Sequence, residues 1–302
     1  ALITLGIKLK EVNKATESFL VEGSEEGFPV KEAELFLGNA GTAFRSLTAA
    51  LAVNEGEYQL SRIPRMHESS IGDLVEALNH LGLKVEYLKN RGYPPLKISP
   101  AEIKHDEVSI KGDVSSQYLT ALLMALPKLK QKLTIKIDGE LISKPYIDIT
   151  LTLLKEFGVE ITHHNYQEFF IPEDATFTSP GEFYVESDAS SASYFLALGA
   201  LCGPLKVKGV GSSSIQGDIE FISALEEMGA EIEWAENYVI VSPPKEGKLK
   251  GIDLDCNHIP DAAMTLAVLA PFATTPTHLR NIASWRVKET DRLHAMATEL
   301  SK

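Results

Sequence analysis

The stretch that decides the fold is DVSSQYLTALLMALP (residues 113–127), in which a short polar segment opens an apolar helix. The same arrangement, a polar loop followed by a helix rich in Ala and Leu, begins again near residues 39, 188 and 257. The four starts at 39, 113, 188 and 257 are therefore spaced by 74, 75 and 69 residues. Self-similarity at a nearly fixed period is typical of a chain built from repeated supersecondary units.

A second helix repeats in step with the first. Runs that open at Asp73, Asp148 and Asp218 each lead to a glycine and then to a strand-like run. The glycines, which predict the C′ position where a positive φ costs least, are Gly82, Gly158 and Gly229. Predicted strands with β-branched or alternating residues include 133–137, 205–210 and 238–241. We therefore expect about four units of roughly 70 to 76 residues each, and we expect both ends of the repeat array to lie outside this sequence, which opens and stops within a unit.

The first helices of the units are apolar nearly all round, as in residues 118–126 and 194–201. Such helices belong inside a layer, covered by sheet or by other helices on every side. The second helices carry charge and are expected to face solvent. The sequence therefore predicts a layered α/β fold of repeated units with buried inner helices. The turn cluster Ser179-Pro180-Gly181 predicts a domain boundary soon after it.

Composition excludes several classes of protein. The formal charge is −13, so nucleic acid and membrane surfaces, both polyanionic, are not expected partners. Two cysteines, Cys202 and Cys256, make neither a disulfide framework nor a metal cluster, which favours a reducing compartment and a cytoplasmic protein. The most apolar runs are shorter than the roughly 20 residues that a bilayer requires.

Each candidate motif has an ordinary structural explanation beside a functional one. Ser115-Ser116-Gln117 opens a helix, which suits an anion, but Ser and Asp are also common helix caps. The loop from Asn39 to Arg45 includes Gly41, which lets a ligand approach the backbone, or it is a plain loop-to-helix junction. Arg65, held by a preceding proline, is placed either to grip a phosphate or carboxylate or to face solvent.

The remaining motifs are equally open when taken singly. Ser143-Lys144-Pro145-Tyr146 stands just before a helix expected to open at Asp148, and it is either a ligand segment or a turn. Asp261 would ordinarily cap the apolar helix that follows it, and the run from Lys288 to Arg292 would ordinarily make surface ion pairs. Together, these motifs place basic and hydroxyl groups at equivalent helix openings of an acidic protein. That combination favours a small, multiply anionic ligand.

Six runs resemble 5-enolpyruvylshikimate-3-phosphate synthases of the bacterial type. They are LFLGNAGTAFRSL (35–47), DVSSQYLTALLMALP (113–127), SKPYIDITL (143–151), DASSASYFLA (188–197), NHIPDAAMT (257–265) and NIASWRVKETDRLHAMATEL (281–300). The resemblance implies two globules, each of three βαβαββ units about a pseudo-threefold axis, with the active site in the cleft between them. It places the hinge near Glu186-Ser187, so the expected domains are 1–186 and 187–302.

The resemblance also implies the activity. The family transfers the enolpyruvyl group of phosphoenolpyruvate to the 5-hydroxyl of shikimate 3-phosphate and releases phosphate, through a tetrahedral intermediate. No metal or organic cofactor is implied, the expected partners are the two small-molecule substrates, and we expect a monomer.

Site residues follow by matching the motifs. Asp261 resembles the carboxylate that takes the 5-hydroxyl proton, and Glu289, beside Lys288, resembles the acid that protonates the methylene carbon of the substrate. The residues matching shikimate 3-phosphate ligands are Ser115, Ser116, Gln117, Ser143, Tyr146, Asp261, Ser284 and Lys288. Those matching the phosphoenolpyruvate side are Asn39, Gly41, Arg65, Gln117 and Arg292.

Some family features differ or lie outside this sequence. Ser284 stands where Asn is common, and Phe44 and Ser46 stand where Met and Pro are common. The P-G-S-K-S loop and the D-H-R segment of the family are not in the sequence, so impaired catalysis is expected of the chain as given.

Two other functions were weighed. A UDP-N-acetylglucosamine enolpyruvyl transferase typically has a Cys in the loop that holds Arg65, and residues 53–73 contain none. A non-catalytic anion-binding fragment of the same fold would have no reason to keep Asp261, Lys288, Glu289 and Arg292 together.

Overall fold

The structure is a computed structural model of the 302-residue chain, and it describes residues 1–287 and 290–302. The chain divides into two compact units. Unit 1 comprises Ala1–Ile142 and Thr150–Pro180, and unit 2 comprises Ser143–Ile149 and Gly181–Lys302. The domain boundary between residues 186 and 187 stays a prediction.

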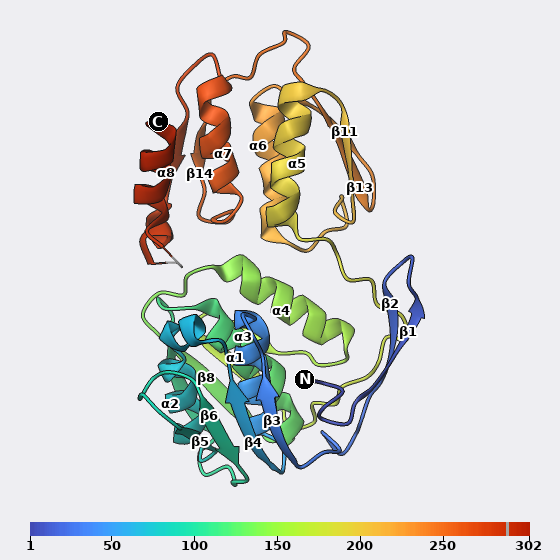
Figure 1. The fold of residues 1–302 in the computed structure, drawn as a ribbon, viewed down its shortest axis with the longest axis vertical. Coiled ribbons are helices and arrows are strands. Elements are labelled where there is room, and N and C mark those ends of the chain that lie inside the picture. The colour runs from blue at the N-terminus through green and yellow to red at the C-terminus, as the bar shows by residue number, and fades with distance from the viewer. Residues whose placement is uncertain (288–289) are drawn as a thin grey trace. The chain divides into compact units, whose positions relative to one another are not determined.

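Unit 1 contains the βαβαββ unit twice, as the family resemblance implies (Figure 1). The first copy consists of β3 (Glu32–Phe36), α1 (Gly41–Ala52), β4 (Glu57–Ser61), α2 (Gly72–His80), β5 (Lys84–Tyr87) and β6 (Leu96–Ser99). The second consists of β7 (Glu107–Lys111), α3 (Ser116–Ala125), β8 (Leu133–Asp138), α4 (Lys144–Glu156), β9 (Thr162–His164) and β10 (Glu168–Ile171). The boundary between the two units falls within α4, whose first residues, up to Ile149, belong to unit 2 and whose remainder, from Thr150, belongs to unit 1.

The two four-stranded sheets of unit 1 have the same topology. Their strand orders are β3-β4-β6-β5 and β7-β8-β10-β9. In each, the first two strands are parallel and the others antiparallel, with Leu35 opposite Leu60 and Ile110 opposite Ile137. A parallel pair requires a crossover connection, and α1 and α3 supply it. Unit 1 also carries the exposed hairpin of β1 (Lys8–Asn13) and β2 (Ser18–Glu22).

Unit 2 is built from related pieces. Its elements are α5 (Ala189–Cys202), β11 (Leu205–Lys208), α6 (Phe221–Glu227), β12 (Glu231–Trp234), β13 (Tyr238–Ser242), β14 (Asp253–Asp255), α7 (Ala263–Leu269), β15 (His278–Arg280) and α8 (Arg292–Leu300). Strands β11, β13 and β12 form an antiparallel sheet in that order, and β14 pairs in parallel with β15.

The glycines after the second helices have the predicted conformation. Gly82, Gly158 and Gly229 have φ of 103°, 83° and 98°. At Gly82 a Cβ would also lie 2.7 Å from the carbonyl oxygen of Glu102. A side chain there would meet both a disfavoured backbone conformation and a fixed backbone atom.

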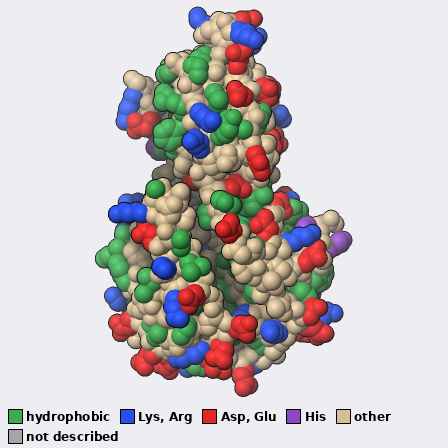
Figure 2. All heavy atoms as spheres, turned by 90° about the vertical axis from the view of Figure 1, so that its right-hand side faces the viewer, with side chains coloured by type: hydrophobic (Ala, Val, Ile, Leu, Met, Phe, Trp, Pro, Cys, Tyr) green, Lys and Arg blue, Asp and Glu red, His purple; other side chains and the backbone are tan. Residues whose placement is uncertain are grey.

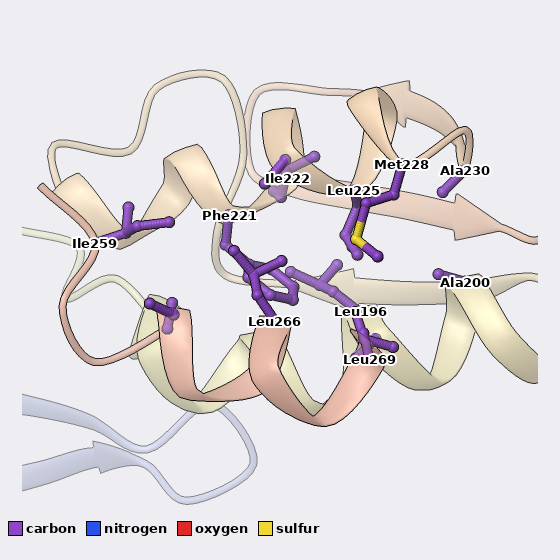
Figure 3. Close-up of a cluster of buried hydrophobic side chains, with 14 of the residues drawn as sticks. Leu196, Ala200, Phe221, Ile222, Leu225, Met228, Ala230, Ile259, Leu266 and Leu269 are labelled. Carbon is purple, nitrogen blue, oxygen red and sulfur yellow. The ribbon is translucent and has the colours of Figure 1, made fainter. Parts of the chain in front are cut away.

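The core of unit 2 lies among α5, α6 and α7. Figure 3 shows Leu196 of α5, Phe221 of α6 and Leu266 of α7 directed toward one another, and all three are buried. Trp285 joins the same cluster, and its indole N–H donates to the carbonyl oxygen of Pro260 at 2.6 Å. Apolar side chains at helical spacing on three helices therefore bury a common face.

The expectation that α5 is covered on every side is wrong. Its buried side packs against β11, β13, α6 and α7, but Tyr194, Phe195 and Leu198 are 65%, 58% and 48% exposed. An apolar composition all round therefore did not guarantee burial, because the described residues supply partners for one side of the helix. In unit 1, α3 is buried along most of its length as predicted, although Met124 is exposed.

The surface matches the acidic, mixed-charge composition. On the face seen in Figure 2, acidic and basic side chains are interspersed rather than gathered into a basic patch. Within the described part of the chain, no helix has the length and apolar character needed to cross a bilayer.

Candidate active site

Several candidate residues lie in or next to loops that follow the carboxyl ends of parallel strands. The loop after β3 leads into α1, that after β7 into α3, and that after β14 into α7. In α/β sheets this is where ligands bind, because the loops and helix N-termini present polar groups there.

In unit 1, the first turns of α1 and α3 are joined through Arg45. The Arg45 Nη1 donates to Gln117 Oε1, and its Nη2 donates to Ser69 Oγ at 3.2 Å. Its guanidinium also lies over the Tyr118 ring, 5.4 Å from the centroid, and the Tyr118 hydroxyl donates to the Ser70 carbonyl at 2.7 Å. Burial raises the pKa of Tyr118, so this hydroxyl keeps its proton. These contacts fix Gln117 against α1.

Asn39 and Gly41 lie at the start of α1, and no side chain caps the first turn of this helix. Its N-terminal N–H groups, with the positive end of the helix dipole, are oriented to accept an anion. Ser115 caps α3 through a hydrogen bond from the Gln117 N–H at 3.3 Å, and Ser116 is buried in the first turn. Helix capping therefore accounts for the Ser115 hydroxyl, one of the two in the Ser115-Ser116-Gln117 motif.

A second arginine, Arg62, lies in the same loop cluster and was not singled out from the sequence. It is 4% exposed, its guanidinium is 5.1 Å from the Phe44 ring centroid, and its Nη2 donates to the Asn39 carbonyl at 3.4 Å. Burial, together with the charge of Arg45, lowers the pKa of Arg62. Arg65, by contrast, is exposed on the short 3-10 helix Pro64–Glu68.

In unit 2, two carboxylates face one tyrosine. The Tyr146 hydroxyl, from the first turn of α4, donates to Asp261 Oδ2 at 2.8 Å and lies 3.4 Å from Asp218 Oδ2. Asp261 Oδ1 accepts from Arg292 Nη1, and this arginine side chain is only 12% exposed. Asp261 does not cap α7, whose N-cap is Ala262 without a side-chain hydrogen bond. Helix capping, the ordinary structural explanation for Asp261, therefore does not hold.

Asp218 belongs to the same cluster as Tyr146 and Asp261 and is 5% exposed. It was not identified as a candidate site residue from the sequence. Its Oδ2 accepts from Ser190 Oγ, and its Oδ1 has no hydrogen-bond partner among the described residues. Burial raises the pKa of Asp218, and the nearby charge of Asp261 adds to the effect. Burial, with both carboxylates nearby, raises the pKa of Tyr146 as well, so it remains a proton donor across the accessible pH range.

The other predicted site residues lie on or near two helices or outside the described residues. Ser143, with φ of 57°, precedes α4, which begins at Lys144 rather than at Asp148, so Tyr146 lies inside the helix. A proline at the second helical position suits such an early start. Ser284 lies on the 3-10 helix Ala283–Val287. Lys288 and Glu289 lie outside the described residues.

The unit 2 cluster could have been suspected from the repeat, since Asp73, Asp148 and Asp218 occupy equivalent positions. The burial of Asp218 had no signal in the sequence. No group of three or more His, Cys, Asp and Glu side chains in the described ranges has the arrangement of a metal site.

Solved structures of known proteins have the same fold as this chain. An EPSP synthase from Acinetobacter baumannii matches 99% of this chain and 68% of its own with a TM-score of 0.82 at 20% identity. The enolpyruvyl transferase NikO from Streptomyces tendae matches 92% of this chain and 64% of its own with a TM-score of 0.60 at 16% identity. The fold is therefore that of the enolpyruvyl transferases.

Sequence comparison gives the particular family. The EPSP synthase (3-phosphoshikimate 1-carboxyvinyltransferase) family matches residues 1–302. A 3-phosphoshikimate 1-carboxyvinyltransferase of Cupriavidus necator is 55% identical over 309 residues, covering all of this chain and 70% of that protein. Another from Vibrio atlanticus is 60% identical over 273 residues, covering 90% of this chain and 63% of that protein. The chain belongs to the EPSP synthase family.

Proposed function

We propose that the chain transfers the enolpyruvyl group of phosphoenolpyruvate to the 5-hydroxyl of shikimate 3-phosphate, with release of phosphate, in the pathway to aromatic amino acids. Family membership over the whole chain supports the reaction. The observation that carries it in the structure is the Asp261 carboxylate, which is held by Tyr146 and Arg292 instead of capping its helix.

Asp261 is the proposed base. As the 5-hydroxyl oxygen bonds to C2 of phosphoenolpyruvate, its proton passes to Asp261, and C3 gains a proton from Glu289. The Glu289 carboxylate then takes a proton back from C3 as the C2–oxygen bond to phosphate breaks, so phosphate leaves and the double bond is restored. A base must lie within hydrogen-bond reach of the proton it takes, and Tyr146 and Arg292 fix the orientation of this carboxylate. The Trp285–Pro260 hydrogen bond fixes the loop that carries it.

The other residues have proposed binding roles. Ser115, Ser116, Gln117, Ser143, Tyr146, Ser284 and Lys288 would bind shikimate 3-phosphate, and Asn39, Gly41, Arg65, Gln117 and Arg292 would bind phosphoenolpyruvate. The link between Arg45 and Gln117 supports an anion site in unit 1. We further propose that the protein is a cytoplasmic monomer with domains 1–186 and 187–302.

The test is turnover. The protein is mixed with phosphoenolpyruvate and shikimate 3-phosphate, and ³¹P NMR follows free phosphate and the enolpyruvyl product together. Asp261→Asn is expected to lower the rate at least about 100-fold, the ordinary size of a general-base contribution, while shikimate 3-phosphate still binds. The matched control Asp253→Asn removes a surface carboxylate that pairs with Arg280.

Three outcomes would contradict the proposal. Near-normal turnover by Asp261→Asn would refute the base assignment. Product formation with UDP-N-acetylglucosamine instead of shikimate 3-phosphate would favour the sister activity. Binding of both substrates without phosphate release would favour the non-catalytic anion-binding alternative.

A further inference from the structure

Two histidines that the proposed function does not use lie against each other at the surface of unit 1. His80 is the last residue of α2, and His105 lies in the segment that joins β6 to β7. Their ring centroids are 5.1 Å apart, and the ring planes are 23° from parallel. Both residues are exposed, and in the described part of the chain neither ring has a hydrogen-bond partner. The ring nitrogens are therefore available to a ligand from solution.

The backbone holds the two histidines together although they are far apart in the sequence. The carbonyl oxygen of Leu81, the C-cap of α2, accepts from the Lys104 N–H at 2.7 Å and from the His105 N–H at 3.4 Å. Gly82 follows with a φ of 103°, and a Cβ there would lie 2.8 Å from the Lys104 nitrogen. The pair is thus pre-organised, and a ligand that bridges both rings does not have to order the backbone first.

The separation of the rings is the one that a shared metal ion requires. In a zinc site the ring centre lies about 3.2 Å from the ion, because the Zn–N bond is about 2.0–2.1 Å and the nitrogen lies about 1.1 Å from the ring centre. Two such centres at a tetrahedral angle are about 5.2 Å apart, against 5.1 Å between His80 and His105. Rotation about χ2 turns each ring plane but leaves its centre in place, and this torsion has broad minima. The nitrogens can therefore be aimed at one point without moving the rings apart.

The surroundings of the pair have room for an ion and its water ligands. Both rings border a surface hollow of about 540 Å³, which Glu102, Lys84 and Lys104 also line. Glu102 contributes a negative charge, and the C-terminal end of α2 adds the negative end of the helix dipole beside His80. Of the two lysines, Lys84 lies 3.7 Å from a carboxylate oxygen of Glu86, and Lys104 is exposed, so its ammonium can extend into water.

We propose that His80 and His105 form a binding site for a divalent transition-metal ion of the zinc class. Imidazole nitrogen suits zinc, copper and nickel, whereas magnesium and calcium prefer oxygen ligands. Water would fill the remaining positions, in keeping with the absence of a three-residue metal group from the described ranges. The ion would link the end of α2, in the first βαβαββ copy, to the segment that leads into the second. The site does not depend on the proposed function, because Ser69 and Ser70 of the candidate active site precede the opposite end of α2.

The test is isothermal titration of the whole chain with zinc chloride, in a buffer that does not bind metals. The parent is expected to bind zinc in the micromolar range. His80→Gln and His105→Gln should each weaken binding at least about 10-fold, since removing even an outer-shell partner of a metal ligand has an effect of that size. The double variant should bind little more weakly than either single variant, because one loss already breaks the pair. Magnesium chloride should give no binding to the parent.

The matched control is His164→Gln, which removes an exposed histidine from a second pair in unit 1. In that pair the His163 Nδ1 already accepts from the Tyr166 N–H at 3.2 Å. His164→Gln should therefore keep the zinc affinity of the parent. The exposed Cys202 of unit 2 is unchanged in every variant, so zinc bound there would persist in all of them.

Thermal unfolding gives a second measurement and checks that the variants fold. Without zinc, His80→Gln and His105→Gln should melt at the temperature of the parent, because substitution of exposed side chains has little effect on stability. Zinc should raise the melting temperature of the parent and of His164→Gln, and should leave that of His80→Gln and His105→Gln unchanged.

Three results would overturn the proposal. The first is parental zinc affinity in either His80→Gln or His105→Gln, since both rings must act together. The second is binding by the parent only at millimolar zinc, which would mean an adventitious ion only. The third is a lower melting temperature of either variant without zinc, together with undiminished stabilisation by zinc, which would give the pair a purely structural role. None of these measurements depends on turnover, so they leave the proposed function standing or falling on its own test.

Discussion

Asp218→Asn should make the stability of unit 2 less sensitive to pH. Asp218 is almost fully buried, and its Oδ1 has no hydrogen-bond partner among the described residues. Burial, reinforced by the charge of Asp261, raises its pKa above the ordinary value of 3.8. A carboxyl whose pKa is raised on folding stabilises the protein fully below the unfolded pKa, and this contribution is lost as pH rises through the folded pKa.

The size of the loss follows from the environment of the carboxylate. An unsatisfied buried acceptor costs about 1–3 kcal/mol, and the cost applies only once the group is ionised. Asparagine has nearly the same shape and stays neutral. The free energy of unfolding of Asp218→Asn, relative to that of the parent, should therefore rise by about 1–3 kcal/mol between pH 4 and pH 8.

Tryptophan fluorescence during urea unfolding measures the right part of the molecule. Both tryptophans, Trp234 and Trp285, lie in unit 2, and Trp285 is fully buried. The control is Asp255→Asn, because the Asn257 N–H and the Asn281 amide lower the pKa of Asp255. Stability from Asp255 is fully present above the ordinary pKa and is lost only as pH falls through the lowered one. Between pH 4 and pH 8 the difference between this variant and the parent should therefore stay flat, with the opposite slope appearing only below about pH 4. Parallel slopes for the two variants, or a flat difference for Asp218→Asn, would refute the reasoning.

Three further changes have definite expected results. Tyr146→Phe removes the donor to Asp261, the proposed base, and should weaken shikimate 3-phosphate binding about 10-fold or more by calorimetry; unchanged affinity would contradict its proposed role. Phe221→Ala should lower the free energy of unfolding of unit 2 by about 3–5 kcal/mol in the fluorescence assay, and a loss below about 1 kcal/mol would mean the core in Figure 3 is wrongly assigned. Gly82→Ala should cost about 1–3 kcal/mol and more than Gly92→Ala, which has a similar positive φ but no atom within 4 Å of its Cβ; equal melting temperatures by circular dichroism would remove the steric argument.

The repeated architecture was predictable because its signals are local. Helix-ending glycines, β-branched strands and polar loops each express a preference of a few neighbouring residues, and the period adds these preferences over several units. The strands predicted at 133–137 and 238–241 are present as β8 and β13. Helix α5 shows the limit of such signals. Its apolar composition allows burial on any side, but the packing of other elements against the helix decides which side is buried.

The site was predictable only where a motif carried it. Asp73 and Asp218 hold the same place in the repeat, yet Asp73 pairs with an exposed lysine, Lys111, at 3.3 Å, whereas Asp218 is buried beside Ser190. The difference arises from partners far away in the sequence, so a single sequence cannot show it. Arg62 was missed for the same reason, since its burial depends on Phe44 and on the Asn39 loop rather than on its neighbours.

The two clusters differ in charge in a way that matches different chemical tasks. The cluster in unit 1 contains Arg45 and Arg62 and no paired carboxylate among the described residues, so it can bind an anion but has no described group placed to take a proton. The cluster in unit 2 contains two carboxylates and a tyrosine that keeps its proton, and Arg292 donates to one of them, Asp261. Burial, with the charge of Asp261 nearby, raises the pKa of Asp218. Under the proposed function, the cluster in unit 1 would hold an anion and the cluster in unit 2 would move a proton.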